Sequence, residues 1–340
     1  MDERLPWHQH LWQQFQQRVA AGRLPHALLL SGPAGLGKLA FARRMAQALL
    51  CEAPAAGGDA CGRCRGCRLF RAGSHPDCSA VRPAEEGKVI KVDQIRDLGA
   101  FLGFTAQYGG YKIALLEPAD RLNINAANSL LKTLEEPPGA CLLLLVTAQP
   151  ARLPATVRSR CQRVSFEPPS LEVAVPWLAV RVAGGLDPET LLDVAGGAPL
   201  AALAYADGER WRRRRELVDG YDQVQAGRID PIRAAESWIQ GDLTENLCWL
   251  IGWHTDLIRL KMSSEPPRLG NPDLRSMLRR WADRYPPRVL FERLDAAVRL
   301  RGLCATTQVN VQMLLEAFLC DAAGDDESSV PRGTRAFKEG

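Results

Sequence analysis

The stretch ALLLSGPAGLGK, residues 27–38, decides the fold. It opens with a short apolar run at 27–30, which predicts a buried strand. A glycine-rich turn follows at 32–37, and a helical pattern continues from residue 38 to residue 50. This order of strand, loop and helix predicts the start of an α/β layer fold.

Three more apolar runs predict strands at residues 112–116, 141–146 and 162–166. Because helical patterns separate these continuous runs, we expect a parallel sheet with helices on both faces. The α/β part then covers residues 1–166 and contains a cysteine-rich insertion at 51–78. No convincing strand follows, so we predict a short helical part at 167–206, an all-helical part at 207–321 and a disordered tail at 322–340.

The composition excludes several classes of protein. Hydrophobic residues make up 46% and charged residues 24% of the 340 residues, so the chain is neither wholly disordered nor fibrous. A net charge of +4 permits contact with nucleic acid but is small for a protein that wraps DNA. The chain has no apolar run of the ~18–20 residues that span a bilayer and no secretory signal pattern. We therefore expect a cytoplasmic protein without membrane contact.

The turn after the first strand matches the phosphate-binding pattern G-x-x-x-x-G-K. Gly32, Gly35 and Gly37 allow successive backbone N–H groups to face an anion, and the following helix adds partial positive charge there. Lys38 would reach the phosphates of a bound nucleotide.

Two parts needed for hydrolysis are missing at their expected positions. The residue after the lysine is Leu39 instead of the Ser or Thr that binds Mg²⁺. The strand at 112–116 leads into Glu117-Pro118, where an acidic pair would be expected. We therefore expect a loop that does not hydrolyse ATP, and passive binding of ATP or ADP stays open.

The spacing Cys51-x9-Cys61-x2-Cys64-x2-Cys67 is the strongest chemical signal in the chain. Thiolates two residues apart can share a metal on a tight turn, and a fourth cysteine closes a tetrahedral site. We predict structural Zn²⁺ on these four residues. The alternative is an iron–sulfur cluster that uses Cys78 as the fourth ligand, although the bacterial ferredoxin pattern has a shorter final gap and a proline after it.

Several segments together resemble one family. They are residues 24–38, the four-cysteine insertion, SHPD at 74–77, NAANSLLKTLEEPP at 125–138 and ATVRSRCQ at 155–162. The combination is similar to the delta prime subunits of the bacterial DNA polymerase III clamp loader, in the AAA+ superfamily. The resemblance covers residues 1–205 strongly and the rest more loosely. It implies an α/β AAA+ domain, a small helical lid and a helical collar that oligomerises.

The resemblance also implies roles for two residues. Ser159-Arg160-Cys161 matches the arginine-finger triplet of the family, so Arg160 would reach in trans to the γ-phosphate of ATP bound by a neighbouring subunit. A planar, permanently charged guanidinium suits the charge that grows on a transferred phosphoryl group. Without the resemblance, Arg160 would be taken as an ordinary surface arginine. Thr147 falls in the region of the first sensor of the family, or is simply the last residue of its strand.

Partners follow from the same resemblance. Clamp-loader subunits, including delta and tau/gamma, form a five-membered ring that opens a sliding clamp and places it on primed DNA. Leu39 and Pro118, together with Leu200 where the lid normally carries a nucleotide-sensing arginine, favour a non-catalytic subunit. The alternatives are an ATP-hydrolysing tau/gamma-type subunit and a zinc-bearing DNA-binding module outside any ring.

A compact basic run, RWRRRR, occupies residues 210–215. Such a run could contact DNA phosphates, with Trp211 stacking on a base. A solvated helix face is the commoner structure for this pattern, and we favour it.

Overall fold

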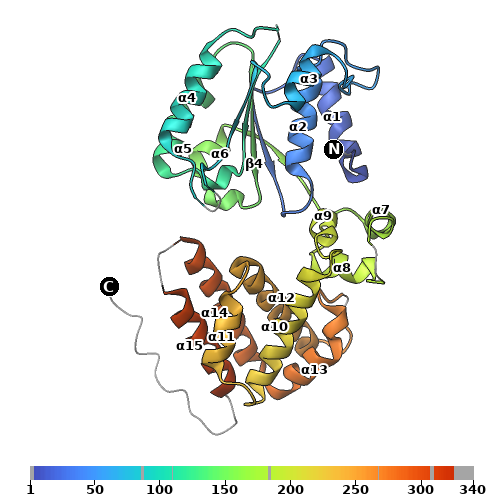
Figure 1. Ribbon diagram of the computed structural model, residues 1–340, viewed down its shortest axis with the longest axis vertical. Coiled ribbons are helices and arrows are strands. Elements are labelled where there is room, and N and C mark those ends of the chain that lie inside the picture. The colour runs from blue at the N-terminus through green and yellow to red at the C-terminus, as the bar shows by residue number, and fades with distance from the viewer. Residues whose placement is uncertain are drawn as a thin grey trace. The chain divides into compact units, whose positions relative to one another are not determined.

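The computed structural model describes residues 4–85, 88–108, 110–182, 185–266, 268–306 and 310–324. The chain divides into two compact units (Figure 1). The first contains the chain up to Trp177 together with Gly197–Ala201, and the second contains Leu178–Gly196 and the chain from Ala202 onward. The separate boundaries of a lid and a collar stay a prediction. The predicted tail begins within the last helix, and its residues from 325 onward lie outside the described residues.

A five-stranded parallel sheet forms the centre of the first unit, in the order β2-β3-β4-β1-β5. The strands are β1 (Ala27–Ser31), β2 (Cys78–Val81), β3 (Lys112–Leu116), β4 (Cys141–Thr147) and β5 (Gln162–Ser165). Every residue of β1, β3 and β4 is buried, as the continuous apolar runs predicted. The parallel sheet of the predicted fold class is therefore confirmed.

Two strands differ from the sequence-based expectation. Strand β2 was not predicted, because it is short, lies at an edge of the sheet and buries only Val81. Strand β5 was predicted as a buried strand, but none of its residues is fully buried. It is the other edge strand, so only one of its sides has a neighbour in the sheet.

Helices cover both faces of the sheet (Figure 1). One layer holds α4 (Val92–Gly103), α5 (Ile124–Glu135) and α6 (Ala155–Ser159), and the other holds α1 (Gln9–Ala20), α2 (Lys38–Leu49) and α3 (Arg65–Arg71). Short 3-10 turns occur at η1 (Pro6–His8), η2 (Ala119–Arg121) and η3 (Pro150–Arg152). Successive β1 residues alternate between the two cores, Leu29 in the first and Leu28 with Leu30 in the second.

The described residues of the second unit form helices and connecting loops, with no strand among them. Its helices include α8 (Pro188–Val194), α10 (Glu209–Gln225), α11 (Pro231–Ile239), α12 (Leu243–Met262), η4 (Pro272–Leu274), α13 (Arg275–Arg284), α14 (Pro287–Thr306) and α15 (Val311–Gly324). Unit boundaries fall within α7 (Leu171–Ala179) and α9 (Pro199–Leu203). Helix α12 packs against α13 and α14, and α11 packs against α15.

An aromatic cluster fills the centre of the second unit. The ring of Tyr221 lies 5.3 Å from that of Trp281, and its distances to Trp238 and Trp253 are 6.3 and 6.4 Å.

Within the described chain, no helix has both the length and the apolar character needed to cross a membrane.

Candidate functional site

Four cysteines come together next to α2 and α3. The sulfur atoms of Cys51, Cys61, Cys64 and Cys67 all lie within 4.8 Å of one another. The Sγ atoms of Cys51 and Cys64 are 3.9 Å apart, close to the separation of two thiolates on one tetrahedral metal. These are the four residues that the spacing predicted, and they could hold one metal ion. Cys78 begins β2 and is not a member of the group, which disfavours the iron–sulfur alternative.

Backbone N–H groups stabilise the sulfur atoms of this cluster. The N–H of Cys61 donates to Sγ of Cys51 at 3.2 Å, and the N–H of Cys64 donates to Sγ of Cys61 at 3.3 Å. Backbone hydrogen bonds from Arg63 and Cys64 lower the pKa of Cys61 to about 6, whereas burial raises the pKa of Cys67. A closed set of four thiolates leaves no position for a reacting water, so the cluster suits a structural metal rather than a catalytic one.

A glycine within α3 allows the close packing of this module. The N–H of Gly66 donates to Oε1 of Glu52 at 2.8 Å. A Cβ at Gly66 would lie 2.4 Å from the carbonyl oxygen of Leu50, so no larger residue fits without a backbone shift. The helix that carries Cys67 is therefore packed directly on the end of α2.

The SHPD segment ties the module to the sheet, a role that its sequence did not reveal. Asp77 is fully buried, and its carboxylate accepts the N–H groups of Gln107 and Tyr108 at 2.9 and 3.0 Å. Lys112 of β3 lies 3.3 Å away. Burial alone would raise the pKa of Asp77, but these N–H groups and Lys112 lower it below the usual value. Asp77 therefore joins β2, β3 and the segment before β3.

The glycine loop lies between β1 and α2, as predicted. Gly32, Gly35 and Gly37 all have positive φ angles, which side chains disfavour. A Cβ at Gly35 would lie 2.6 Å from Cβ of Ala201, and a Cβ at Gly37 would lie 2.3 Å from Cδ1 of Leu5. Each glycine is therefore needed for the local backbone, whether or not a phosphate binds.

Lys38 is bonded to its own loop. Its Nζ donates to the carbonyl oxygens of Gly32 and Pro33 at 2.8 and 2.5 Å, and the residue is buried. Burial lowers the pKa of Lys38, although the carboxylates of Asp120 and Glu117 act in the opposite direction. The ammonium group of Lys38 thus stabilises the loop through hydrogen bonds to two of its carbonyl oxygens.

The segment before α1 also stabilises the glycine loop through hydrogen bonds. The carbonyl oxygen of Leu36 accepts hydrogen bonds from Trp7 Nε1 at 3.0 Å and from His8 Nε2 at 2.7 Å. Burial lowers the pKa of His8 to about 4, so the ring is neutral at pH 7 and donates its Nε2 proton to this carbonyl. Neither residue could be singled out from the sequence, since nothing near them in the sequence indicates a partner in the loop.

A hollow of about 340 Å³ lies at the loop, and the residues that the sequence singled out there line it, except Gly32. They include Gly35, Gly37, Lys38, Leu39, Glu117, Pro118, Thr147 and Leu200. Thr147 donates its hydroxyl proton to Asp120 and accepts the N–H of Gln149 at 2.9 Å. The hollow therefore presents Leu39 where a working site would present an Mg²⁺ ligand, and Pro118 where it would present a side chain that orients the attacking water.

Arg160 lies at the surface immediately after α6. Its Nη2 is 2.6 Å from Oε1 of Glu135, its Nη1 donates to the carbonyl of Thr156 at 3.1 Å, and its side chain is 37% exposed. The next strand, β5, runs parallel to β1, with Gln162 opposite Leu28. Arg160 precedes β5, whereas the glycine loop follows β1.

The two features therefore lie at opposite ends of the same sheet. They are separated along the strands by at least about 10 Å, the rise of three residues. Arg160 therefore lies away from the glycine loop of its own chain.

Comparison with known families decides the relationship. The family described as "DNA polymerase III, delta subunit" matches residues 7–170, and "DNA polymerase III, delta subunit, C terminal" matches residues 208–323. The DNA polymerase III subunit delta' of Pseudomonas aeruginosa is 39% identical over 320 residues, which cover 92% of this chain and 95% of that protein. The chain belongs to the delta' family of DNA polymerase III subunits. The resemblance found in the sequence is thus confirmed.

Two further relatives sharpen this assignment. The delta' subunit of Escherichia coli is 34% identical over 319 residues, covering 92% of this chain and 94% of that protein. The tau subunit of Bacillus subtilis is also 34% identical, but over 203 residues, or 59% of this chain and 34% of tau. These two delta' proteins therefore match this chain over nearly its whole length, whereas the tau subunit matches only part of it.

The basic run of this delta' family chain is largely occupied within its own unit. Acidic partners lie at 2.8–4.0 Å, in the pairs Arg210–Glu245, Arg212–Glu216, Arg213–Glu216, Arg214–Asp273 and Arg215–Asp219. This pairing favours the solvated helix face over a DNA contact. Arg214 is an exception that neither interpretation anticipated, because it is 1% exposed and bonded to Asp273 and Asn271.

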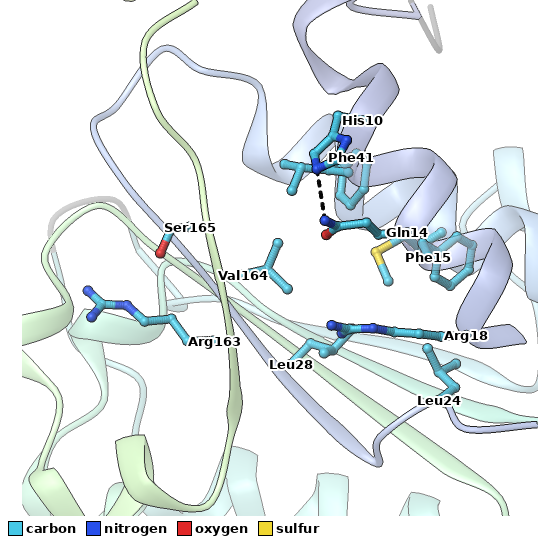
Figure 2. Close-up of a pocket in the computed structure, with 12 residues that line it drawn as sticks. His10, Gln14, Phe15, Arg18, Leu24, Leu28, Phe41, Arg163, Val164 and Ser165 are labelled. Carbon is cyan, nitrogen blue, oxygen red and sulfur yellow. Dashed lines mark hydrogen bonds between the residues drawn. The ribbon is translucent and has the colours of Figure 1, made fainter.

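A second hollow of the delta' fold, of about 300 Å³, lies between α1 and β5 (Figure 2). Leu28, Phe15 and Val164 give it an apolar lining. His10 and Gln14 hydrogen-bond to each other at 2.8 Å, and Arg163 points away towards Ser31 (Figure 2). Three of its polar side chains, those of His10, Gln14 and Arg163, are therefore engaged with one another or with the sheet.

Proposed function

We propose that this delta' family chain is the non-catalytic subunit of a DNA polymerase III clamp loader that provides Arg160 in trans. The observation that carries the proposal is the position of Arg160 at the end of the sheet opposite the glycine loop. An exposed guanidinium there can stabilise charge on a phosphate held by a neighbouring subunit, but not on one held by its own loop.

The ion pair with Glu135 is compatible with this role. Both side chains are substantially exposed, at 37% and 50%, and such pairs contribute about 0–1 kcal/mol. Arg160 can therefore exchange the Glu135 carboxylate for a phosphate oxygen at little cost. In the isolated chain, the ion pair with Glu135 holds the guanidinium of Arg160 at the surface.

The hollow at the glycine loop supports the absence of ATP hydrolysis by this chain. Leu39 and Pro118 line it, and neither can bind Mg²⁺ or orient a water. Lys38 is committed to the carbonyl oxygens of Gly32 and Pro33. ATP or ADP bound there would have to displace those bonds.

The metal of the four-cysteine module is zinc in this proposal. A compact set of four thiolates is the ligand set of structural Zn²⁺, and Zn²⁺ adds no redox chemistry. It would hold residues 51–78 as a folded surface module, for which the chain itself offers few buried residues.

The wider assembly follows from the family. The chain would join delta and tau/gamma subunits in a five-membered ring in the cytoplasm, with residues 167–206 as the lid and 207–321 as the oligomerising collar. The ring would open the sliding clamp and place it on primed DNA. Contact with DNA would come through the complex.

The test is reconstitution with delta, tau/gamma, the clamp and primed DNA. Arginine fingers are worth ~10³-fold or more at the site that they serve, so Arg160→Ala should nearly silence one ATP site and lower the turnover of the ring accordingly. Arg158→Ala, in the last turn of α6, is the matched control and should leave turnover unchanged. Equal turnover of the wild-type and Arg160→Ala complexes would remove the assignment.

The alternative is an ATP-hydrolysing subunit of tau/gamma type, favoured by the G-x-x-x-x-G-K pattern and by Glu117 at the hollow. The isolated chain distinguishes the two. Mg²⁺-dependent ATP turnover that disappears in Lys38→Ala would establish the alternative.

A further inference from the structure

A concave surface next to the cysteine module is lined by arginines. It has a volume of about 540 Å³ and lies where α2, α3 and the loop between them meet. We call it the arginine pocket, and its lining includes Arg4, Arg43, Arg44, Asp59, Phe70 and Arg71. No feature of the proposed function uses this surface.

The pocket has an excess of positive charge that its own carboxylate does not balance. Four guanidinium groups face one aspartate. Asp59 is bound by Arg44 through Nε and Nη2, both at 2.7 Å, and by Nη2 of Arg4 at 3.1 Å. The ring of Trp12 lies 3.8 Å from the guanidinium carbon of Arg44 and helps to fix it. One side of the pocket is therefore held in place.

The other two arginines of the pocket, Arg43 and Arg71, have guanidinium N–H donors available to a ligand. Among the described residues, neither Arg43 nor Arg71 has a carboxylate within 4.0 Å, and both are exposed. Arg43 lies 5.9 Å from the ring of Phe70, and Arg71 donates one N–H to the carbonyl of Gly62. Each guanidinium carries five N–H donors, so most of theirs are available to a ligand.

The shape and lining of the pocket select among anions. Arginine forks match both carboxylates and phosphates. Single-stranded nucleic acid also needs exposed aromatic faces on which its bases stack. The aromatic residue of this lining, Phe70, is only 6% exposed. A concavity of this size suits a few side chains of a peptide better than the convex backbone of a duplex.

We propose that the arginine pocket binds an acidic peptide segment of a partner protein, with carboxylates on Arg43 and Arg71. The ordered pair of Arg44 and Asp59 forms the wall against which the peptide lies. This site is independent of Arg160 and of the proposed role in ATP turnover.

The test measures binding by the full chain, loaded with zinc, using fluorescence anisotropy. The probes are a labelled peptide of ten glutamates and a labelled oligothymidylate of matched length. The variants are Arg43→Gln, Arg71→Gln and the double substitution, with Arg68→Gln as a control on α3 that does not line the pocket. All change one charge per site at exposed positions, and circular dichroism checks that each variant is folded.

The proposal expects salt-sensitive binding of the peptide that falls about tenfold or more in the double variant, since that variant removes the charged donors of both exposed arginines. Arg68→Gln should change binding less than twofold. Absence of peptide binding, or an equal loss in Arg68→Gln, would overturn the proposal. Oligothymidylate binding that the double variant loses would assign the pocket to nucleic acid instead.

Discussion

Replacing Lys38 by methionine tests whether this lysine stabilises the folded loop or binds a phosphate. The lysine is 6% exposed, and its Nζ lies 2.8 Å from the carbonyl oxygen of Gly32 and 2.5 Å from that of Pro33. Methionine keeps a long, flexible apolar stem but has no donor. The substitution therefore removes both bonds while largely preserving the packing of the side chain.

The size of the effect follows from these contacts. A hydrogen bond from a charged group contributes roughly 1.5–3 kcal/mol, and two acceptors lose their partner. The loss is offset because the ammonium is no longer buried, a cost that its lowered pKa records. We expect a net loss of about 1–3 kcal/mol in the free energy of unfolding. The melting temperature should then fall by several degrees.

Two measurements on the same variant decide between the roles. Thermal or urea unfolding of the isolated chain gives the stability, and ATP turnover of the reconstituted complex gives the activity. Lys38→Arg retains charge and donors and serves as the control. Unchanged stability of Lys38→Met, combined with a large loss of turnover, would refute a purely structural lysine.

Three other changes have defined outcomes. Metal analysis should find about one zinc per chain, which Cys67→Ser lowers; iron with visible absorbance would contradict the zinc assignment. Because burial lowers the pKa of His8 from 6.5 to about 4, the unfolded chain binds more protons between these values. Stability should fall by up to about 3 kcal/mol as pH drops through that window, and His8→Gln should remove this component in pH-dependent urea unfolding. Asp77→Asn removes the carboxylate paired with the buried Lys112, which keeps its hydrogen bond to the carbonyl of Pro76. The change should lower the free energy of unfolding by about 3–5 kcal/mol, against less than about 1 kcal/mol for Asp93→Asn at an exposed pair, both measured by urea unfolding.

Features of the fold that depend on local pattern could be predicted from the sequence. Strands β1, β3 and β4 are continuous apolar runs because helices cover both of their faces. The four cysteines were predictable for a similar reason, since ligands on a tight turn must be closely spaced.

Features that depend on distant partners could not be predicted in this way. Strand β5 has the composition of an edge, and only the sheet order explains why Gln162 and Arg163 stay exposed. Asp77 meets N–H groups 30 and 31 residues further along the chain. The arginine pocket joins residue 4, helix α2 and helix α3, so no single segment of sequence contains its pattern.

The glycine loop shows why a motif can survive without the chemistry usually read from it. A Cβ at Gly32 would lie 2.2 Å from the carbonyl oxygen of Phe166, and a Cβ at Gly37 would lie 2.3 Å from Cδ1 of Leu5. Lys38 closes the loop from inside, where it is bonded to two of the carbonyl groups. The positions of G-x-x-x-x-G-K therefore each have a physical reason that involves no nucleotide. The sequence departs from a working site at the next residue, Leu39, which stands where Ser or Thr would bind Mg²⁺. The pattern by itself indicates the shape of the loop, whereas the residue after it indicates whether the loop can hydrolyse ATP.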